Sequence, residues 1–305
     1  MNIKNTQLER IIPKNHVLYN EPLNRHSNIK IGGPADSLVT IADKDTFVQV
    51  VKYCRVQHIR FLTLGSATNV LFADAGFRGL VLIANFTGIQ LVHENTIDVQ
   101  AGTSLADIKR FCIAHSLTGF EFASGIPGTI GGAIYGNAGA YGKSISDCLR
   151  RATVLTPNGQ VREVNKEFFN FAYRDSELKR NNCILISAEL EFTRGDYAQI
   201  LSKVREIHAI RANKLPHWSV PTAGSYFKNI KDAQGNATAA AVYLEAVGSK
   251  QTSVGDAAVH PKHANIIYNR GNARAADVLE LEAILKKRVF EQFGIELQRE
   301  VMYIE

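Results

Sequence analysis

The sequence has no long apolar run, and this absence limits what the protein can be. Across its 305 residues, no stretch reaches the roughly 18 consecutive apolar residues that a membrane-spanning helix needs. The N-terminal segment 1–16 also lacks the apolar core of a secretion signal. We therefore expect a cytoplasmic protein without a membrane partner.

Cysteine is scarce, and no CxxC pair is present. The cysteines lie more than 30 residues apart, at Cys54, Cys112, Cys148 and Cys183. This pattern predicts buried free thiols in a reducing compartment. His260 and His263 have the spacing of metal ligands, but no second pair accompanies them, so we expect no metal site.

Basic residues exceed acidic residues only modestly. The chain has 35 lysines and arginines against 29 aspartates and glutamates, which gives a net charge of +6 and a pI of about 9.1. The basic residues are scattered, and the longest cluster is Lys286–Arg288. This distribution favours the attraction of small polyanionic ligands over nucleic-acid binding. A nucleotide- or nucleic-acid-binding module stays open as an alternative, because the pI is high.

Glycine, in contrast, is concentrated in one place. Seven of the 23 glycines lie in the segment 125–142, which reads GIPGTIGGAIYGNAGAYG. Glycine disfavours regular helix and strand, so we expect a loop whose N–H groups converge on an anionic ligand. Neither the Rossmann glycine spacing nor the end of a P-loop is present. A tight turn system without a ligand is the alternative interpretation.

The N-terminal half predicts mixed helix and strand from its apolar spacing and turn residues. A helix is expected to begin after Ser104, which can cap it, and to end before Gly119. The other expected elements are strands at 38–42, 60–65 and 80–84, a helix at 45–58 that completes a βαβ-like unit, and a hairpin of 89–92 with 96–100.

The C-terminal half is predicted to begin with strands and to end with a long helix followed by a final strand. The expected elements are a hairpin of 151–156 with 160–164, strands at 184–193, 225–229, 263–269 and 297–304, and helices at 196–213, near 237–247 and at 274–293. The fold class is therefore α+β. We expect two lobes, 1–75 and 76–205, and a third domain, 206–305.

Several motifs occur in an order that resembles one enzyme family. They are IKIGGPAD (29–36), the glycine-rich segment 125–142, YRDS (173–176), PTAGSYFKN (221–229), KHANIIYN (262–269) and LQREV (297–301). Together they resemble the UDP-N-acetylenolpyruvoylglucosamine reductases (MurB family), which act in peptidoglycan precursor synthesis. The short chain is similar to the type II form of that family.

The resemblance implies a fold, cofactors and an activity. The first two lobes would bind FAD non-covalently in a fold of the vanillyl-alcohol-oxidase type, and the third domain would bind the UDP-sugar. NADPH would supply the hydride that reduces UDP-N-acetylglucosamine enolpyruvate to UDP-N-acetylmuramate. We expect a monomer with these small-molecule substrates and no nucleic-acid partner. Another FAD oxidoreductase of the same fold, acting on a sugar or a hydroxy acid, is the alternative.

The same resemblance implies three catalytic residues. Arg174 matches an arginine that stabilises the developing negative charge, and its planar fork can hold a carboxylate in two contacts. Ser225 matches the proton donor, and Glu300 matches a glutamate that acts with the arginine. Read without the family, Arg174 is as well explained by pairing with Asp175 or Glu177, and Ser225 by a turn.

The remaining predicted site residues are assigned by ligand. Tyr173, Lys228, Asn229 and His263 are expected to bind the substrate, with Asn265 as a further candidate. The expected FAD contacts are Gly65, Ser66, Ala67, Thr68, Asn69, Gly125, Ile126, Pro127, Gly128, Gly131, Gly132, Asn137, Ala138 and Gly139.

Some positions depart from the family pattern. Segment 65–69 reads GSATN where the family has more glycine, and Ile230 stands where proline is usual. Gln298 replaces the first glutamate of the family's Leu-Glu-x-Glu-Val, whereas the second glutamate is retained as Glu300. Segment 248–261 differs most.

Overall fold

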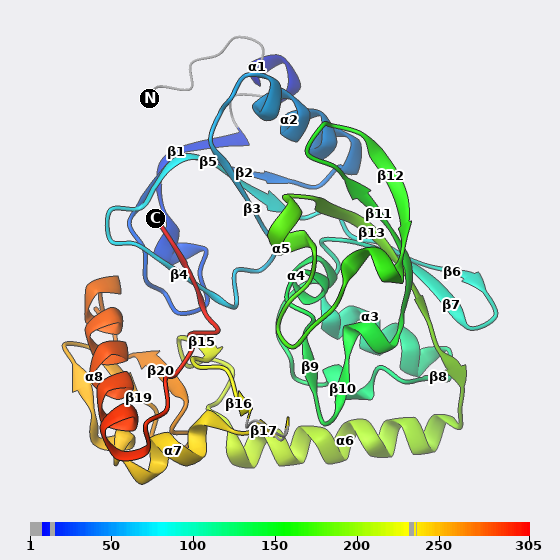
Figure 1. Ribbon diagram of the computed structural model, residues 1–305. Helices are drawn as coiled ribbons and strands as arrows, with labels where there is room; N and C mark the ends of the chain where they lie inside the picture. Colours follow the sequence, from blue (N-terminus) through cyan, green and yellow to red (C-terminus); the bar gives the residue numbers. More distant parts are fainter. Residues whose placement is uncertain (1–7, 13–15, 232–234, 236) are drawn as a thin grey trace. The chain divides into compact units, whose positions relative to one another are not determined.

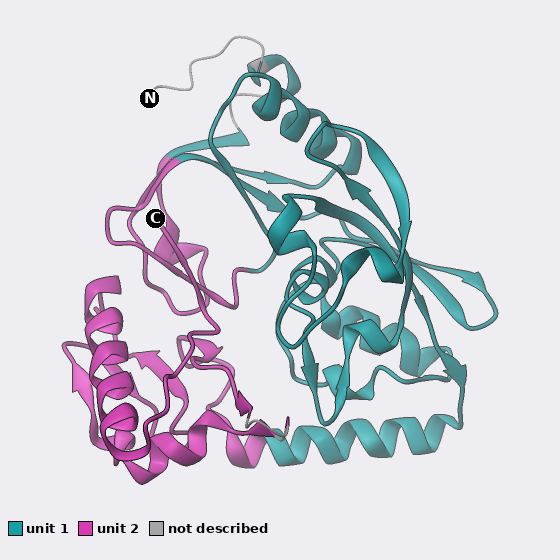
Figure 2. Ribbon diagram, in the orientation of Figure 1, with its two compact units in different colours: residues 1–19, 37–66, 79–211 teal, residues 20–36, 67–78, 212–305 magenta. Residues whose placement is uncertain are grey.

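The structure is a computed structural model that describes residues 8–12, 16–231, 235 and 237–305. The chain divides into two compact units (Figure 2). Unit 1 comprises Met1–Tyr19, Ser37–Ser66 and Gly79–Arg211, and unit 2 comprises Asn20–Asp36, Ala67–Arg78 and Ala212–Glu305. Each unit buries its own cluster of apolar side chains.

Two sheets form the frame of unit 1 (Figure 1). One has the order β1-β2-β5-β3, with β3 parallel to β5, and its strands are β1 (Val17–Pro22), β2 (Pro34–Ile41), β3 (Phe61–Leu64) and β5 (Phe77–Ala84). The other is antiparallel, in the order β12-β11-β13-β7-β6. Its strands are β6 (Ile89–His93), β7 (Thr96–Gln100), β11 (Leu149–Leu155), β12 (Val161–Asn165) and β13 (Ile184–Glu191). Both predicted hairpins, β6–β7 and β11–β12, are confirmed.

The longer helices of unit 1 begin where a polar side chain caps them. Asp43 accepts the Thr46 N–H at 2.7 Å before α2 (Lys44–Val56), and Ser104 accepts the Asp107 N–H at 3.0 Å before α3 (Leu105–Ala114). The Ser104 cap is thus confirmed. The other helices are α1 (Leu8–Ile11), α4 (Ile130–Tyr135), α5 (Leu178–Asn181), α6 (Tyr197–Lys214) and the 3-10 turns η3 (Glu121–Ala123), η4 (Ile145–Asp147) and η5 (Lys166–Phe169). The short strands are β8 (Leu117–Thr118), β9 (Gly139–Ala140), β10 (Lys143–Ser144) and β14 (Thr193–Arg194).

Unit 2 contains a four-stranded sheet in the order β15-β20-β19-β18, with α8 packed on β18 and β19. Gly294 ends α8 in the left-handed conformation at φ 67°, as its position after the predicted helix indicates. The strands are β15 (Thr222–Ser225), β18 (Ser253–Val254), β19 (Ala257–Val259), β20 (Ile266–Asn269), and the paired β16 (Ile230–Lys231) with β17 (Ala237–Thr238) and β4 (Val70–Phe72) with β21 (Met302–Ile304). The helices are α7 (Ala240–Ala246), α8 (Ala275–Phe293) and the 3-10 turns η2 (Leu23–Arg25) and η6 (Ser249–Gln251).

Three sequence predictions are wrong in detail. The glycine-rich segment does contain a helix, α4, because Thr129 caps its first turn and tertiary packing outweighs the low helix propensity of glycine. The strand expected at 225–229 is β15, which ends at Ser225, and the strand expected at 297–304 is limited to β21. Helix α3 ends at Ala114, before Gly119 as expected, and the chain then enters β8.

The cysteine prediction is confirmed, since all four thiols are free and buried. Burial raises the pKa of Cys54 and of Cys148 to about 12. Thiols with such pKa values are almost entirely protonated at neutral pH and react slowly. The lobe and domain boundaries at residues 75 and 205 stay a prediction.

Candidate active site

The predicted flavin loops meet within unit 1. A Cβ atom added to Gly65 would lie 2.2 Å from Oγ1 of Thr129, so the end of β3 and the start of α4 are in direct contact. Only glycine fits there without displacing the Thr129 side chain. Thr129 was not among the predicted residues. A threonine before a helix is a capping signal, but the surrounding glycines obscured the helix itself.

The first N–H groups of α4 are occupied by the protein. The Ile130 N–H donates to Thr103 and the Gly131 N–H to Ala101, both at 2.9 Å, and the Gly132 N–H donates to Oγ1 of Thr129 at 3.3 Å. These groups are therefore bonded within unit 1. The role of the glycine-rich segment in anion binding stays a prediction, and these three N–H groups are not available for it.

An arginine that sequence reasoning missed lies beside that segment. Nη2 of Arg211, on α6, donates to the Gly125 carbonyl at 2.9 Å. This contact brings a positive charge to the start of the glycine-rich segment, and Gly125 itself has a φ of 75°. A guanidinium and positive-φ glycines at one place suit a ligand that carries phosphate. The 86-residue separation in sequence gave no signal of the contact.

The segment 173–176 is fastened to the end of α4. Nδ2 of Asn137 donates to the Ala172 carbonyl at 2.9 Å, and Oγ of Ser176 donates to the Tyr135 carbonyl at 2.9 Å. Asn137 is buried, with 9% of its surface exposed. The amide of Asn137 therefore positions the YRDS turn in the structure, whereas its predicted contact with the flavin stays a prediction.

Arg174 lies at the bend of a tight turn. Ala172 and Asp175 exchange backbone hydrogen bonds at 3.1 and 3.2 Å, and Arg174 adopts a φ of 56° between them. Its guanidinium carbon lies 5.2 Å from the ring centroid of Tyr173. A non-glycine residue at positive φ carries backbone strain, and residues strained in this way cluster at functional sites.

The carboxylates next to Arg174 pair with a different arginine. Arg180 contacts Asp175 and also binds Glu177, whose Oε2 lies 2.9 Å from Nε. Nζ of Lys179 donates to the Arg174 carbonyl at 2.6 Å. Both carboxylates thus have Arg180 as a partner.

In unit 2, the segments that carry Ser225 and Glu300 lie side by side. The Glu300 N–H donates to the Tyr226 carbonyl and the Lys228 N–H to the Gln298 carbonyl, both at 2.8 Å. Phe227 and Arg299 form an antiparallel bridge between them. Ser225 is exposed, and Lys228 and Glu300 are half-buried. The structure therefore brings the segment of Ser225 and Lys228 together with that of Glu300, which is distant in sequence.

The predicted flavin loop also reaches this place. Nδ2 of Asn69 donates to the Glu300 carbonyl at 3.3 Å, and the Met302 N–H donates to the Asn69 carbonyl at 3.0 Å. The loop 65–69 passes from unit 1 into unit 2 at Ala67, which has a φ of 47°. Asn69 is thus held next to the backbone of Glu300.

Asn265 and His263 support the same segment. The side chain of Asn265 accepts the Phe227 N–H and donates to the Phe227 carbonyl, each at 2.8 Å. Nδ1 of His263 accepts the Asn265 N–H at 3.2 Å. Burial, reinforced by the nearby Lys250, lowers the pKa of His263, so its ring is neutral at pH 7. Asn229 is exposed at the end of the same segment.

Comparison with known proteins identifies the family. Residues 35–165 match the FAD binding domain family, and residues 216–304 match the C-terminal domain of UDP-N-acetylenolpyruvoylglucosamine reductase. A reductase of that name from Caldanaerobacter subterraneus subsp. tengcongensis is 38% identical over 298 residues, covering 98% of this chain and 97% of the relative. One from Clostridium novyi is 35% identical over 300 residues, covering 98% and 96%.

The chain belongs to the UDP-N-acetylenolpyruvoylglucosamine reductase family. The crystal structure of UDP-N-acetylenolpyruvylglucosamine reductase (MurB) from Thermus caldophilus matches 95% of this chain and 98% of that chain, with a TM-score of 0.78 and 28% identity. The expected fold class is thereby confirmed, and FAD is the cofactor that the family's N-terminal domain binds.

The residues of unit 1 fit that cofactor. The close approach of Gly65 to Thr129, the positive φ of Gly125 and Gly128, and the guanidinium of Arg211 together provide backbone access and positive charge. In the reductase chain, Arg174 and Tyr173 belong to unit 1, whereas Ser225, Lys228, His263 and Glu300 belong to unit 2. The individual roles of these residues stay predictions.

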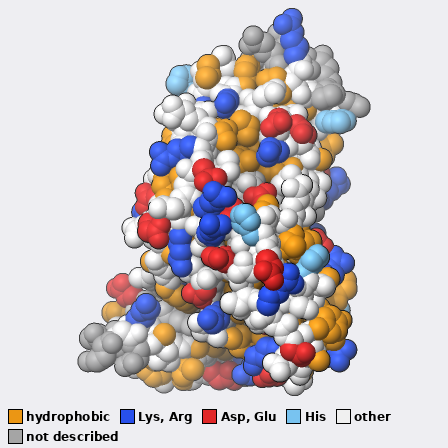
Figure 3. Space-filling model, turned by 90° about the vertical axis from the view of Figure 1, so that its right-hand side faces the viewer, with side chains coloured by type: hydrophobic (Ala, Val, Ile, Leu, Met, Phe, Trp, Pro, Cys, Tyr) orange, Lys and Arg blue, Asp and Glu red, His pale blue; other side chains and the backbone are white. Residues whose placement is uncertain are grey.

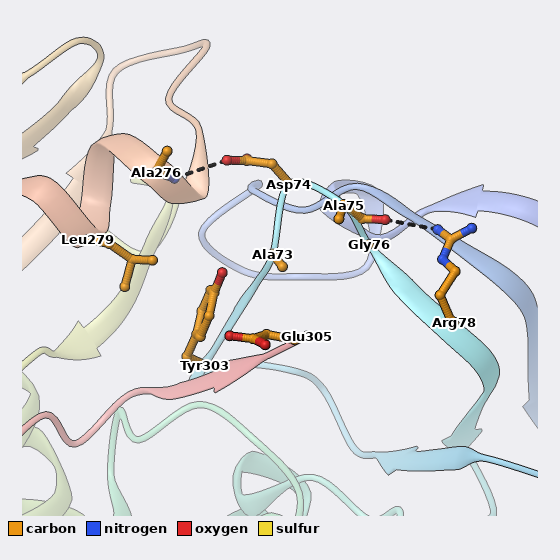
Figure 4. Close-up of a pocket in the computed structure, with 9 residues that line it drawn as sticks. All are labelled: Ala73, Asp74, Ala75, Gly76, Arg78, Ala276, Leu279, Tyr303 and Glu305. Carbon is orange, nitrogen blue, oxygen red and sulfur yellow. Dashed lines mark hydrogen bonds between the residues drawn. The ribbon is translucent and has the colours of Figure 1, made fainter.

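A separate cavity of about 460 Å³ lies within unit 2, and none of the predicted site residues lines it (Figure 4). Asp74 points from it to the start of α8, where its carboxylate accepts the N–H groups of Ala275 and Ala276 at 2.7 and 3.0 Å. Arg78 is held by Asp36 at 2.9 Å. The polar groups of this cavity thus serve to cap α8 and to fix a loop.

The surface does not present a concentrated positive charge on the face shown in Figure 3, where basic and acidic side chains alternate. In the described part of the chain, no helix combines the length and the apolar character needed to cross a bilayer. Within residues 8–12, 16–231, 235 and 237–305, no group of His, Cys, Asp or Glu side chains is arranged to hold a metal ion.

Proposed function

We propose that the protein reduces UDP-N-acetylglucosamine enolpyruvate to UDP-N-acetylmuramate, with NADPH as the hydride source. The observation that carries this proposal is the match to reductases of that name over 98% of the chain. The relatives' similarity covers both the FAD-binding domain and the C-terminal domain. Bound FAD would accept the hydride from NADPH and deliver it to C3 of the enolpyruvyl group.

Arg174 would stabilise the negative charge that develops on the substrate, and Glu300 would act beside it. Addition of hydride at C3 places negative charge on C2 and on the attached carboxylate. The planar guanidinium of Arg174 can hold that carboxylate in two contacts, provided that the turn keeps it fixed. The two hydrogen bonds from Asn137 and Ser176 supply this rigidity, because they fasten the turn to α4.

Ser225 would donate the proton to C2. Its exposure and its position directly after Gly224, which has a φ of 80°, support a role at the surface of a substrate site. A serine hydroxyl is a weak acid, so it needs a defined position close to the carbon that it protonates. Backbone pairing with the segment of Glu300 supplies that position. Lys228, Asn229 and Tyr173 would contact the UDP-sugar, and His263 would help to shape its site.

The remaining parts of the proposal concern partners and location. We propose a monomeric cytoplasmic enzyme that binds neither nucleic acid nor membranes. On the face in Figure 3, basic and acidic side chains alternate, so that face lacks the continuous basic surface that nucleic-acid binding generally requires.

The experiment that tests the function is NADPH oxidation by the purified holoenzyme, with and without UDP-N-acetylglucosamine enolpyruvate. Oxidation that requires the sugar nucleotide and yields one UDP-N-acetylmuramate per NADPH would support the proposal. Oxidation that depends only on oxygen, with no sugar product, would refute it and indicate a flavin oxidase with another substrate. Replacement of NADPH by NADH in the same assay tests the choice of hydride source.

A further inference from the structure

A buried carboxylate on α8 connects the two segments that carry Ser225 and Glu300. Only 4% of the surface of Glu282 is exposed. Its Oε2 accepts a hydrogen bond from the Tyr226 hydroxyl at 2.7 Å and lies 3.2 Å from Nε of Arg299. Its Oε1 lies 2.6 Å from Nζ of Lys286. One carboxylate thus binds a residue from each of the two segments.

The two partners of Glu282 are sequence neighbours of the proposed catalytic residues. Tyr226 follows Ser225, and Arg299 precedes Glu300. Tyr226 is fully buried, whereas Ser225 is exposed, so adjacent residues on this segment serve the core and the surface respectively. The hydrogen bond from the Glu300 N–H to the Tyr226 carbonyl also joins the two segments through the backbone. A shift of either partner would therefore move a residue of the proposed site.

The cluster is under electrostatic constraint. Burial, together with the charge of Glu282 and its hydrogen bond, raises the pKa of Tyr226, so the phenol remains a donor. Nη1 of Arg299 is buried and has no hydrogen-bond partner among the described residues. Because this part of the half-buried guanidinium is shielded from water, Arg299 relies on Glu282 as its counter-charge, and its Cζ also lies 5.5 Å from the ring centroid of Tyr303. Loss of the carboxylate charge would release Arg299 and loosen Tyr226 at the same time.

We propose that Glu282 is a positioning residue for the oxidative half-reaction, in which the sugar substrate is reduced, and that it acts through Tyr226 and Arg299. This inference rests on the proposed function, because it assigns Ser225 and Glu300 to that reaction. The carboxylate fixes the spacing of the two segments, so that the Ser225 hydroxyl and the Glu300 carboxylate meet the same substrate atoms. Proton transfer depends steeply on such spacing, and a displacement of about 1 Å can reduce a rate about 100-fold.

The chain offers a matched control on the same helix. Asp277 is also a buried carboxylate, with 7% exposure, and its Oδ1 pairs with Arg274 at 3.0 Å. Neither Asp277 nor Arg274 contacts the segments of Ser225 or Glu300 through any of the bonds described. Asp277→Asn therefore removes a buried charge from α8 without loosening the proposed site.

The test measures the two half-reactions separately in wild-type holoenzyme, Glu282→Gln and Asp277→Asn. We expect Glu282→Gln to change flavin reduction by NADPH by less than about twofold and to slow flavin reoxidation by the enolpyruvyl sugar by about 10- to 100-fold. The loss should appear in the saturating rate rather than in the substrate dependence. Asp277→Asn should keep both wild-type rates, even if it lowers the unfolding temperature as much as Glu282→Gln does. Equal reoxidation rates in the two variants would overturn the inference.

A second comparison guards against a general loss of structure. In a Ser225→Ala background, Glu282→Gln should slow reoxidation by a smaller factor than in the wild type, because the proton donor that it positions is absent. The same factor in both backgrounds would show that Glu282 acts only on overall stability. Failure of the wild-type flavin to be reoxidised by the sugar would refute the proposed function itself, and with it this role of Glu282.

Discussion

The contact between Gly65 and Thr129 makes a quantitative prediction about unit 1. In Gly65→Ala, the new methyl carbon would lie 2.2 Å from Oγ1 and 3.1 Å from Cγ2 of Thr129. Thr129 cannot simply rotate away, because Oγ1 caps α4 through the Gly132 N–H. Overpacking of this kind destabilises by about 1–3 kcal/mol. Loss of the cap would destabilise by about 0.5–2 kcal/mol if the side chain turns instead.

We expect Gly65→Ala to lower the free energy of unfolding of unit 1 by about 1–3 kcal/mol and to reduce the flavin retained on gel filtration. The assays are urea unfolding of the apoprotein and the flavin-to-protein ratio of the holoenzyme. Gly132→Ala is the matched control for the unfolding measurement, since its nearest neighbour would be Oγ1 of Thr129 at 3.8 Å, an ordinary contact. Alanine inside a helix should stabilise by about 0.5–1 kcal/mol.

A double variant separates the clash from other effects of the substitution. Thr129→Ala removes the two closest atoms and leaves only Cβ, 3.2 Å from the new methyl carbon. The loss in Gly65→Ala/Thr129→Ala should therefore be smaller than the sum of the two single losses. Wild-type stability and flavin content in Gly65→Ala, or strictly additive losses in the double variant, would refute the reasoning.

Three further predictions concern single residues. Ser225→Ala should leave flavin reduction by NADPH intact and slow reoxidation by the sugar roughly 10²–10⁴-fold, as stopped-flow absorbance would show; equal loss in both half-reactions would make Ser225 structural. Arg174→Lys keeps the charge but loses the two-contact geometry, so the steady-state kcat/KM for the sugar should fall roughly 10- to 150-fold, and near-normal activity would remove Arg174 from the site. Glu189 is buried, and burial alone would raise its pKa. Hydrogen bonds from Arg151 and Arg150 outweigh burial and lower the pKa of Glu189 from its usual value of 4.5. The ionised Glu189 therefore stabilises the fold fully above pH 4.5, and this contribution is lost as the pH falls through the lowered pKa. Glu189→Gln should destabilise the protein by about 1–3 kcal/mol at pH 7 and by less in acid. Urea unfolding at both pH values measures the difference.

Elements whose signals are local could be predicted from the sequence. Helix α3 begins at the Ser104 cap, and α8 ends at Gly294, because a side-chain acceptor and a positive-φ residue act within one turn of the helix. The hairpin β11–β12 forms around Pro157-Asn158-Gly159 for the same reason. In each case the deciding interaction lies within a few residues of the element that it defines.

Elements that depend on distant partners could not be predicted in the same way. Strand β21 is limited to Met302–Ile304 because its partner is β4, and β4 offers only Val70–Phe72. Helix α4 forms in spite of its glycines because the Ile130 and Gly131 N–H groups bond to carbonyls near the start of α3. Neither partner leaves a mark in the local sequence.

The motifs located the proposed site but did not reveal what supports it. The family pattern pointed to Ser225 and Glu300, whose roles stay predictions, yet nothing in the sequence linked them to Glu282. A glutamate on an amphipathic helix is ordinarily solvent-exposed, and charged residues are almost never fully buried unless they are paired. Only the structure shows that Glu282 is buried in contact with Tyr226 and Arg299.

The last strand explains why residues so distant in sequence can act together. The Met302 N–H bonds to Asn69 and the Ala73 N–H bonds to Ile304, so the segment after the loop 65–69 and the end of the chain fix each other. Glu300 lies just before this pairing, and its own N–H bonds to the segment that follows Ser225. Within unit 2, therefore, a residue of the predicted flavin loop and two of the proposed catalytic residues share one continuous set of backbone hydrogen bonds. Their relative positions therefore depend on main-chain hydrogen bonds, to which the side-chain contacts of Glu282 with Tyr226 and Arg299 are added.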